Sequence, residues 1–223
     1  MSKQDLQQRF WESQHDFRDY HHPIVRFFAR QRWQYLSQFV PFEKIKLGLD
    51  VGCGGGFSNI YAQEHFPCIG CDYSAYMLTQ NQKSNILRAN AEKLPFKDKS
   101  FDLVFCWELL HHIDKPMLVI NEMARVSRNW VIVFEPNPFN PAQLIFALFH
   151  PEHRGALKTS KTRLRQLTAE ALLRPLVVDT VGFIFPNKTP NWLFRILKIL
   201  PFRILCFGIS NVLVAQKETE RSI

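Results

Sequence analysis

Short apolar runs alternate with longer mixed segments through the middle of the chain. Five runs have the length of a β-strand: KLGLDV (46–51), PCIGCD (67–72), NILRAN (85–90), FDLVFC (101–106) and WVIVFE (130–135). Three segments between them, 56–65, 74–82 and 115–127, are long enough for helices. Strands that alternate with helices are typical of a parallel sheet whose crossover helices cover both faces. The pattern therefore predicts an α/β fold.

The regions on either side of this alternation follow a different pattern. Residues 5–40 combine aromatic and charged side chains at helical spacing, and the break at His21-His22-Pro23 predicts two helices there. After Pro136 we expect a helix, a basic stretch and a second helix over 141–173, a strand at 176–185, a basic amphipathic helix at 190–206 and a last strand at 210–216. No repeat or linker divides the chain, so the sequence predicts a single domain over 1–223.

Composition and charge narrow the class of protein. Apolar residues make up 46% of the 223 residues and charged residues 22%, which excludes collagen-like, coiled-coil and wholly disordered chains. The net charge of +8 lies in the flanks: residues 49–150 have 8 basic and 10 acidic side chains, residues 1–48 have 8 and 5, and residues 151–223 have 12 and 5. Basic flanks suit an anionic substrate, a membrane surface or nucleic acid, although solvated helix faces produce the same pattern.

Cysteine usage and the terminal segment predict a cytoplasmic protein. The five cysteines are odd in number and mostly lie in apolar runs, as is typical of a reducing compartment. Cys68 and Cys71 have the spacing of half a zinc site, but no second pair follows, so we expect no bound metal. The N-terminus is too polar for a signal peptide, and charged residues interrupt the apolar stretch 191–215, which argues against a spanning helix.

The segment LDVGCGGG (49–56) is the most informative motif. A predicted strand ends there in glycines at alternate positions, Gly52, Gly54 and Gly56. Such a turn brings backbone N–H groups and a helix N-terminus against a ligand, because glycine tolerates positive φ and has no side chain in the way. The dinucleotide-binding pattern would need a further glycine at Phe57, so an oxidoreductase that uses NAD is disfavoured. Asp72 follows 20 residues after Gly52, where a carboxylate can bind ribose hydroxyls, and this indicates an adenosyl ligand.

These residues are part of a wider resemblance. Four blocks resemble the class I S-adenosylmethionine-dependent methyltransferases, in the branch that includes enzymes of ubiquinone and menaquinone biosynthesis: LDVGCGGG (49–56), IGCDYSAYML (69–78), ANAEKLPFKDKSFDLVFCWELLHHI (89–113) and WVIVFEPN (130–137). The resemblance implies a Rossmann-like, doubly wound sheet of seven strands, mostly parallel, with an antiparallel last strand and helices on both faces. It also implies that S-adenosylmethionine is the cofactor and S-adenosylhomocysteine the product.

The resemblance also implies how the chain is divided and where the cofactor lies. The division is a helical cap (1–45), a cofactor-binding core (46–137), a substrate-side insertion (138–175) and C-terminal strands and helix (176–223). The glycine loop and Asp50 would hold the methionine part, Asp72 the ribose, and the following residues the adenine. The implied cofactor-binding set is Asp50, Gly52, Cys53, Gly54, Gly56, Asp72, Tyr73, Met77, Asn90, Ala91, Glu92, Cys106 and Trp107. Two positions depart from the family: Asn90 replaces a common aspartate, and SRNW (127–130) replaces a Pro-Gly-Gly turn.

Methyl transfer from a sulfonium is an in-line displacement, so the protein must align a nucleophile, exclude water and, for some acceptors, remove a proton. The candidate catalytic residues follow the fourth predicted strand, because ligands bind at the carboxyl ends of strands. They are Glu108, His111 and His112, with Glu135, Asn137, Tyr20 and His22 as further candidates. At most one of the two neighbouring histidines is expected to face the ligand. The alternative for each candidate is a capping or packing role.

The flanks have to recognise the methyl acceptor, because the cofactor takes up the central sheet. The segment 141–149 is apolar and suits a greasy substrate or a lid. The segment 153–165 suits phosphate or another anion, since it contains Arg154, Lys158, Lys161, Arg163 and Arg165. We therefore expect a small-molecule substrate that is amphipathic and either anionic or lipid-linked.

Two other functions stay open. One is an RNA methyltransferase, which the basic flanks favour. Base-amino methylases usually have an Asp/Asn-Pro-Pro-aromatic motif after the fourth strand, where this chain has CWEL (106–109), and this argues against nucleic acid. The other is a protein that binds S-adenosylmethionine without catalysis.

The segment NWLFRILKILPFR (191–203) predicts an amphipathic helix whose regular part ends at Pro201. Apolar side chains share one broad face and basic side chains the other, which is the geometry of an interfacial helix. The two sets are Trp192, Leu193, Ile196, Leu197 and Leu200, and Arg195, Lys198 and Arg203. Either the apolar face packs on the sheet, or the helix makes peripheral contact with an anionic membrane or binds an anionic headgroup of the substrate.

Overall fold

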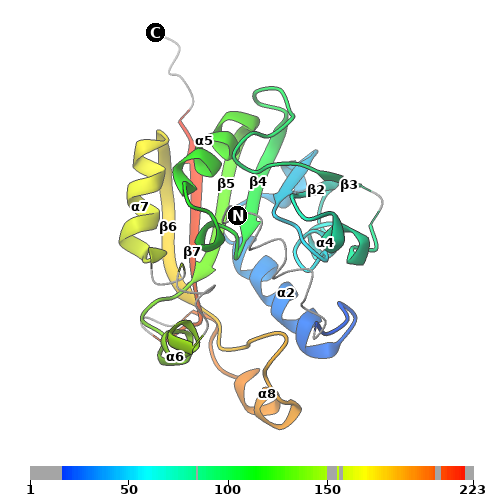
Figure 1. Ribbon diagram of the computed structural model, residues 1–223, viewed down its shortest axis with the longest axis vertical. Helices are drawn as coiled ribbons and strands as arrows, with labels where there is room; N and C mark the ends of the chain where they lie inside the picture. Colours follow the sequence, from blue (N-terminus) through cyan, green and yellow to red (C-terminus); the bar gives the residue numbers. More distant parts are fainter. Residues whose placement is uncertain (1–16, 84, 150–154, 156–157, 204–206, 219–223) are drawn as a thin grey trace.

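The computed structural model describes residues 17–83, 85–149, 155, 158–203 and 207–218 (Figure 1). Most of the first predicted N-terminal helix lies outside these ranges. The strands are β1 (Gly48–Val51), β2 (Cys68–Asp72), β3 (Ile86–Arg88), β4 (Phe101–Trp107), β5 (Ser127–Pro136), β6 (Leu173–Val181) and β7 (Ser210–Lys217). The helices are α2 (Pro23–Leu36), α3 (Asn59–Ala62), α4 (Ala75–Gln80), α5 (Pro116–Val126), α6 (Pro141–Phe149), α7 (Lys161–Glu170) and α8 (Asn191–Leu197).

The strands form one sheet with the order β3-β2-β1-β4-β5-β7-β6. β1 to β5 pair in parallel, whereas β7 is antiparallel to both β5 and β6. The predicted α/β sheet of seven strands, mostly parallel with an antiparallel last strand, is confirmed. The chain reverses its direction of travel across the sheet between β1 and β4. Open α/β sheets bind ligands at the carboxyl ends of strands beside such a point.

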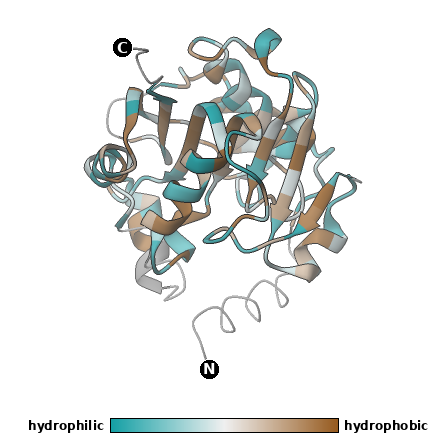
Figure 2. Ribbon diagram, turned by 90° about the horizontal axis from the view of Figure 1, so that it is seen from above, coloured by the Kyte–Doolittle hydropathy of each residue, from teal (hydrophilic) through white to brown (hydrophobic). Residues whose placement is uncertain are grey.

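Side chains of the central strands alternate between two hydrophobic layers. In β4, which is buried throughout, Leu103, Phe105 and Trp107 join the layer that includes α2 and α3. Val104 and Cys106 face the other layer, which includes α5 and α7. Figure 2 shows the strands of the sheet largely hydrophobic, as expected for a sheet covered on both faces. The alternation decides which β4 side chains can reach a ligand.

β6 begins and ends earlier than the predicted strand at 176–185. The edge of a sheet tolerates proline, and β6 passes through Pro175 with a shift of register before Val177. Gly182, with a φ of +74°, follows the last strand residue. The predicted end of this strand is therefore wrong, and residues 182–190 form a loop that extends toward the carboxyl ends of β1 and β4.

Two helices are shorter than predicted, and the SRNW segment, which replaces the Pro-Gly-Gly turn of the family, is part of a strand. α3 covers Asn59–Ala62 rather than 56–65, because turns of the glycine-rich segment continue to Ser58. α8 ends at Leu197, well before 206. The SRNW segment forms no loop, since β5 starts at Ser127 directly after α5. Among the described helices, none is long and apolar enough to cross a membrane.

Candidate functional site

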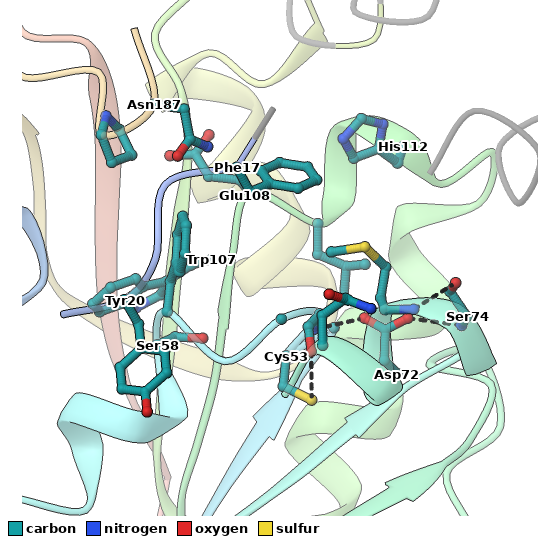
Figure 3. A pocket seen from close by; sticks show the side chains of 18 of the residues that line it. Phe17, Tyr20, Cys53, Ser58, Asp72, Ser74, Trp107, Glu108, His112 and Asn187 are labelled. Carbon is teal, nitrogen blue, oxygen red and sulfur yellow. Dashed lines mark hydrogen bonds between the residues drawn. The ribbon is translucent and has the colours of Figure 1, made fainter. Parts of the chain in front are cut away.

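A cavity of about 670 Å³ lies at the carboxyl ends of the central strands (Figure 3). Its size is typical of small-molecule sites, which range over roughly 300–1,000 Å³. One wall consists of the loop after β1 and the ends of β2 and β3. The opposite wall consists of the end of β4, the segment 17–20, part of α2 and the loop 185–187. The two walls combine residues from nearly the whole described chain.

The glycine loop has the backbone geometry that its sequence predicts. Gly52, Gly54 and Gly56 have φ values of +77°, +46° and +98°. A Cβ atom at Gly52 would lie 2.8 Å from the Leu109 side chain, so only glycine fits there. The Gly52 and Cys53 N–H groups donate to the Cys71 carbonyl at 2.8 and 3.0 Å, which fixes the loop over the end of β2. Gly52, Cys53 and Gly54 line the cavity, whereas Gly56 is not among the described lining residues.

Asp72 offers the carboxylate oxygens that ribose hydroxyls can donate to. Its carboxylate accepts hydrogen bonds from the Gly54 N–H at 2.9 Å and the Ser74 N–H at 2.8 Å (Figure 3). The backbone of Tyr73 also hydrogen-bonds this carboxyl group, and a carboxylate, with about four lone-pair sites, keeps acceptor capacity for a ribose hydroxyl. Burial raises the pKa of Asp72 above its ordinary value, and the backbone N–H groups oppose this shift.

Asp50 does not reach the cavity in the described structure. The Ser58 hydroxyl donates to Asp50 Oδ2, and the backbone of Asn59 also hydrogen-bonds this carboxyl group. Asp50 therefore holds the start of α3 and with it the glycine loop, which corrects the prediction that it contacts the methionine part. The side chain is fully buried, and this burial raises its pKa to about 8. Its Oδ1 atom has no hydrogen-bond partner among the described residues.

Replacing Asp50 with asparagine is expected to stabilise the protein increasingly as the pH rises. Because the folded-state pKa is about 8 and the ordinary value 3.8, wild-type folding takes up a proton between these pH values. The free energy of unfolding therefore falls as the pH rises through this window. Asparagine is neutral throughout and places an N–H₂ donor at the unpartnered Oδ1 position. Urea unfolding at pH 5 and pH 8 measures the difference, with Glu43→Gln at an exposed site as the control; equal pH slopes for Asp50→Asn and wild type would contradict it.

The predicted adenine surface lies on the same wall as Asp72. Tyr73, Met77, Asn90 and Ala91 line the cavity, but Glu92 does not line it in the described structure. The Glu92 N–H donates to Asn90 Oδ1 at 2.9 Å, so this amide is already oriented by its own turn. The prediction that Glu92 edges the adenine is therefore not supported.

Only one of the two predicted residues at the end of β4 faces the cavity. Trp107 lines it, and Cys106 lies fully buried in the layer that contains α5 and α7. Adjacent strand residues point to opposite faces of a sheet. The prediction that Cys106 closes the site is therefore wrong.

The buried carboxylate of Glu135 holds the turn after β4 by hydrogen bonds to its backbone. Glu135 accepts hydrogen bonds from the N–H groups of Leu109, Leu110 and His111 at 2.9, 2.6 and 3.1 Å. The His111 Nδ1 atom lies 2.8 Å from the same carboxylate. Glu135 is fully buried and acts as a positioning residue for this turn. Asn137 has a structural role too, because its Nδ2 donates to the Gly208 carbonyl at 2.8 Å.

The three predicted catalytic residues have different places in this turn. His112 and Glu108 line the cavity (Figure 3), whereas His111 is not among its described lining residues. The two imidazole rings lie against each other with centroids 3.8 Å apart, and yet only one faces the ligand space. Glu108 has a φ of +58°, a left-handed conformation that a non-glycine residue adopts only when its surroundings hold it there.

Glu108 is held by an arginine from the N-terminal region. Arg32 on α2 donates from Nη2 to Glu108 Oε1 at 3.0 Å and to the Ser210 hydroxyl at 2.7 Å. The Ser210 hydroxyl donates to the same Glu108 oxygen at 3.0 Å. The guanidinium lies 4.0 Å from the centroid of the Phe28 ring and 5.0 Å from that of Trp107. Burial lowers the pKa of Arg32, and the neighbouring Glu108 opposes this shift.

Comparison with known proteins identifies the domain that carries this site. Residues 49–133 match the family model of a methyltransferase domain. A ubiquinone biosynthesis O-methyltransferase from Hahella chejuensis is 28% identical over 163 residues, 67% of this chain and 65% of the relative. The crystal structure of an S-adenosylmethionine-dependent methyltransferase from Thermotoga maritima has a TM-score of 0.70 and 21% identity, and covers 87% of this chain and 92% of its own. Residues 49–133 belong to a methyltransferase domain family, and the described chain has the fold of S-adenosylmethionine-dependent methyltransferases.

Other relatives share shorter segments with this methyltransferase domain. "Probable tRNA methyltransferase 9B" from Mus musculus is 31% identical over 101 residues, 42% of this chain and 22% of that protein. The chain thus spans less than two thirds of the curated relatives it matches. The match to the family model includes Asp72, Trp107 and Glu108 but not Arg32 or Ser210. The family match therefore includes the cofactor wall, whereas much of the opposite wall lies outside the matched residues.

The N-terminal segment crosses the methyltransferase domain above the cavity. Arg18 donates from Nη1 to the Pro186 carbonyl at 2.8 Å and from its backbone N–H to Asn187 Oδ1 at 3.2 Å. The Tyr61 hydroxyl donates to the Tyr20 carbonyl at 2.7 Å. Tyr20 lines the cavity, whereas His22 caps α2 by accepting from the Ile24 N–H.

The predicted anion-binding stretch lies elsewhere in the methyltransferase domain. α7 packs through Leu164 and Leu167 on the layer that includes α5. Of the five basic residues, Arg154 lies outside the described ranges. The other four, Lys158, Lys161, Arg163 and Arg165, are absent from the described cavity lining. The only described segment of 138–175 that contributes to the cavity is α6, through Gln143.

Sequence reasoning missed Arg32, although a signal for it exists. Val25, Phe28 and Arg32 are spaced by three and four residues, so Arg32 lies on the buried face of an amphipathic helix. A charged residue at such a position is seldom buried without a partner. Phe185 and Asn187 had no comparable signal, because they were assigned to the end of a strand and the loop after it.

Proposed function

We propose that this chain transfers the methyl group of S-adenosylmethionine to a small amphipathic acceptor bound beside Trp107. The observation that carries the proposal is the continuity of the cavity. One space joins the Asp72 carboxylate and the glycine loop to a second wall of aromatic and polar side chains. The described members of that wall include Phe17, Tyr20, Phe28, Trp107, Glu108, His112, Phe185 and Asn187.

The chemistry divides between the cofactor and the protein. S-adenosylmethionine supplies an activated methyl group on a sulfonium that becomes a neutral thioether. The protein holds the ribose at Asp72, excludes water with its aromatic wall and orients the acceptor. His112 is positioned to take the proton of an acceptor hydroxyl or ammonium group, since its imidazole faces the cavity. Glu108 stays fixed by Arg32 and Ser210, so it can accept a hydrogen bond from the acceptor without moving.

The nature of the wall supports an acceptor that combines a ring with a polar substituent. Phe28 and Trp107 offer aromatic faces, and Glu108 and His112 offer hydrogen-bonding groups beside them. No described lysine lines the cavity, and both lining arginines already donate to protein oxygens. These contacts support a neutral or weakly acidic ring hydroxyl more than a phosphate.

A methyl-transfer assay with labelled cofactor tests the proposal. The chain is incubated with S-adenosylmethionine labelled in the methyl group, together with a dihydroxybenzoate, a long-chain alkylphenol or bulk tRNA. We expect label in the phenolic products and none in tRNA, with Asp72→Ala as the background control. Label in tRNA alone would favour the RNA alternative and overturn the small-molecule acceptor. No transfer to a phenol, despite cofactor binding by calorimetry, would overturn the acceptor class.

Replacing His112 with asparagine is expected to lower turnover by about 100-fold, the lower end of the contribution of a positioned base. Cofactor affinity should change little, because His112 lies on the acceptor side of the cavity. His111→Asn is the matched control: it alters the neighbouring histidine, whose Nδ1 contacts buried Glu135, and should lower thermal stability more than turnover per folded molecule. Equal turnover of His112→Asn and wild type would remove His112 from the mechanism.

A further inference from the structure

Six of the thirteen large apolar residues that are exposed in the described structure lie at one edge of the sheet. α6 follows the carboxyl end of β5 and α8 follows that of β6, so both lie at the edge where the cavity is (Figure 1). Exposed large apolar residues there are Phe139, Leu144, Ile145, Trp192, Ile196 and Ile199, and we call this set the α6/α8 edge. Soluble surfaces seldom concentrate large apolar side chains in this way unless they bind something.

α8 is oriented so that its apolar residues divide between the protein and the outside. Phe194 packs edge-on against Phe27 of α2 with ring centroids 5.3 Å apart, and Leu197 also contacts the hydrophobic layer. Trp192, Ile196 and Ile199 are 66%, 54% and 77% exposed. Trp192 and Ile196 are four residues apart, so at 100° per residue they share one face of α8, and Ile199 lies just beyond the end of this helix. Of the two alternatives for the apolar face, packing on the protein holds for Leu197 but not for Trp192 and Ile196, because the helix packs through Phe194 and Leu197.

The charges around this apolar arc have one sign. Lys188, Arg195 and Lys198 are exposed and form no ion pair with another described residue. The sequence contains no aspartate or glutamate between Asp179 and Glu218, and Asp179 is paired with Arg203 at 2.9 Å. Apolar side chains with a tryptophan, flanked by basic residues, are the combination that binds an anionic lipid surface. A protein partner would be recognised mainly by the shape of the surface, and charge of a single sign does not by itself indicate one.

The same edge is continuous with the mouth of the cavity. Phe185, Pro186 and Asn187 line the cavity and lead directly into α8. Gln143 on α6 also lines it, in the same helix as exposed Leu144 and Ile145. A surface bound at the α6/α8 edge would therefore lie against the cavity opening.

We propose that the α6/α8 edge binds peripherally to membranes that contain anionic lipids. Trp192, Ile196 and Ile199 enter the headgroup region, and Lys188, Arg195 and Lys198 contact lipid phosphates. The bound orientation places the cavity mouth at the lipid surface, where an amphipathic acceptor is concentrated. Vesicle binding itself requires neither cofactor nor methyl transfer, so this proposal stands or fails separately from the proposed function.

Flotation with vesicles tests the proposal. The full chain is mixed with vesicles of phosphatidylcholine alone, or of phosphatidylcholine with phosphatidylglycerol, at low and high salt. We expect binding to the phosphatidylglycerol vesicles that high salt weakens. The double variant Arg195→Gln with Lys198→Gln should bind about thirty-fold more weakly, because each basic residue near an anionic surface contributes a factor of about five. Trp192→Ser with Ile196→Ser should reduce binding at least about ten-fold through lost apolar burial.

Matched variants on another part of the surface serve as controls. Leu172→Ser removes an apolar side chain that is 79% exposed, and Arg165→Gln with Lys93→Gln removes two exposed charges. Both should bind vesicles as wild type does. Absence of wild-type binding at low salt would overturn the proposal, and so would equal losses in the control variants. A dimer in light scattering that Trp192→Ser with Ile196→Ser dissociates would also overturn it, since a second copy would then cover this edge.

Discussion

Replacing Asp72 with alanine is expected to weaken S-adenosylmethionine binding by about 5- to 150-fold, the range for removing a charged hydrogen-bond acceptor worth about 1–3 kcal/mol. The loss has two sources. The ribose hydroxyls lose their acceptor, and the Gly54 N–H loses the oxygen that holds the glycine loop at 2.9 Å. Isothermal titration calorimetry measures the effect for both the cofactor and S-adenosylhomocysteine.

The control for Asp72 is an acidic residue outside the cavity. Asp98 is 72% exposed at its side chain and pairs with Arg125, so Asp98→Ala removes the same charge from the whole protein. This variant should bind the cofactor as wild type does. The variant Asp72→Asn should also bind the cofactor weakly. Its amide has a single oxygen, so it cannot accept from both the Gly54 and the Ser74 N–H groups as the two carboxylate oxygens do. Wild-type affinity in Asp72→Ala would contradict the assignment of the ribose site.

Replacing Glu108 with glutamine is expected to lower the free energy of unfolding by about 3 kcal/mol, because it leaves the buried Arg32 charge without its partner. The amide can still accept hydrogen bonds from Arg32 and Ser210, so the effect isolates the charge. Adding Arg32→Met should recover part of the stability, since no buried charge then remains. Urea unfolding at pH 7 measures all three variants.

α2 supplies a matched control for this pair. Arg30, two residues from Arg32, pairs with Glu64 at 2.8 Å, but both side chains are well exposed. Glu64→Gln should therefore cost less than about 1 kcal/mol. Equal effects of Glu64→Gln and Glu108→Gln would show that burial of Arg32 adds nothing to the interaction.

The sequence predicts the central sheet well because its strands are buried on both faces. β1, β2 and β4 are mainly apolar, and Gly52, Asp72 and Trp107 lie at or directly after their ends, so the position of each strand also indicates where a ligand binds. β6 was misplaced because it lies at the sheet edge, where partly exposed residues and Pro175 hide its start. Boundaries were accurate where burial constrained every residue and inaccurate where it did not.

The cofactor wall was also more predictable than the acceptor wall. Gly54 and Asp72 follow two consecutive strands, β1 and β2, which pair in parallel. Parallel strands end at the same edge of a sheet, so the two residues can be expected to lie close together. Arg32 meets Glu108 and Ser210 only after α2 packs on the sheet, across separations of 76 and 178 residues. No local pattern contains such a contact. The error at Cys106 has a simpler reason. Adjacent side chains of a strand point to opposite faces of the sheet, so Cys106 and Trp107 cannot both face the cavity.

A crystal structure of the full chain with S-adenosylhomocysteine tests the central claim most directly. We predict that both ribose hydroxyls donate to the Asp72 carboxylate, that the adenine lies between Tyr73 and Ala91, and that the sulfur points toward the space between Trp107 and His112. A ligand bound elsewhere, or one whose ribose does not contact Asp72, would contradict the account.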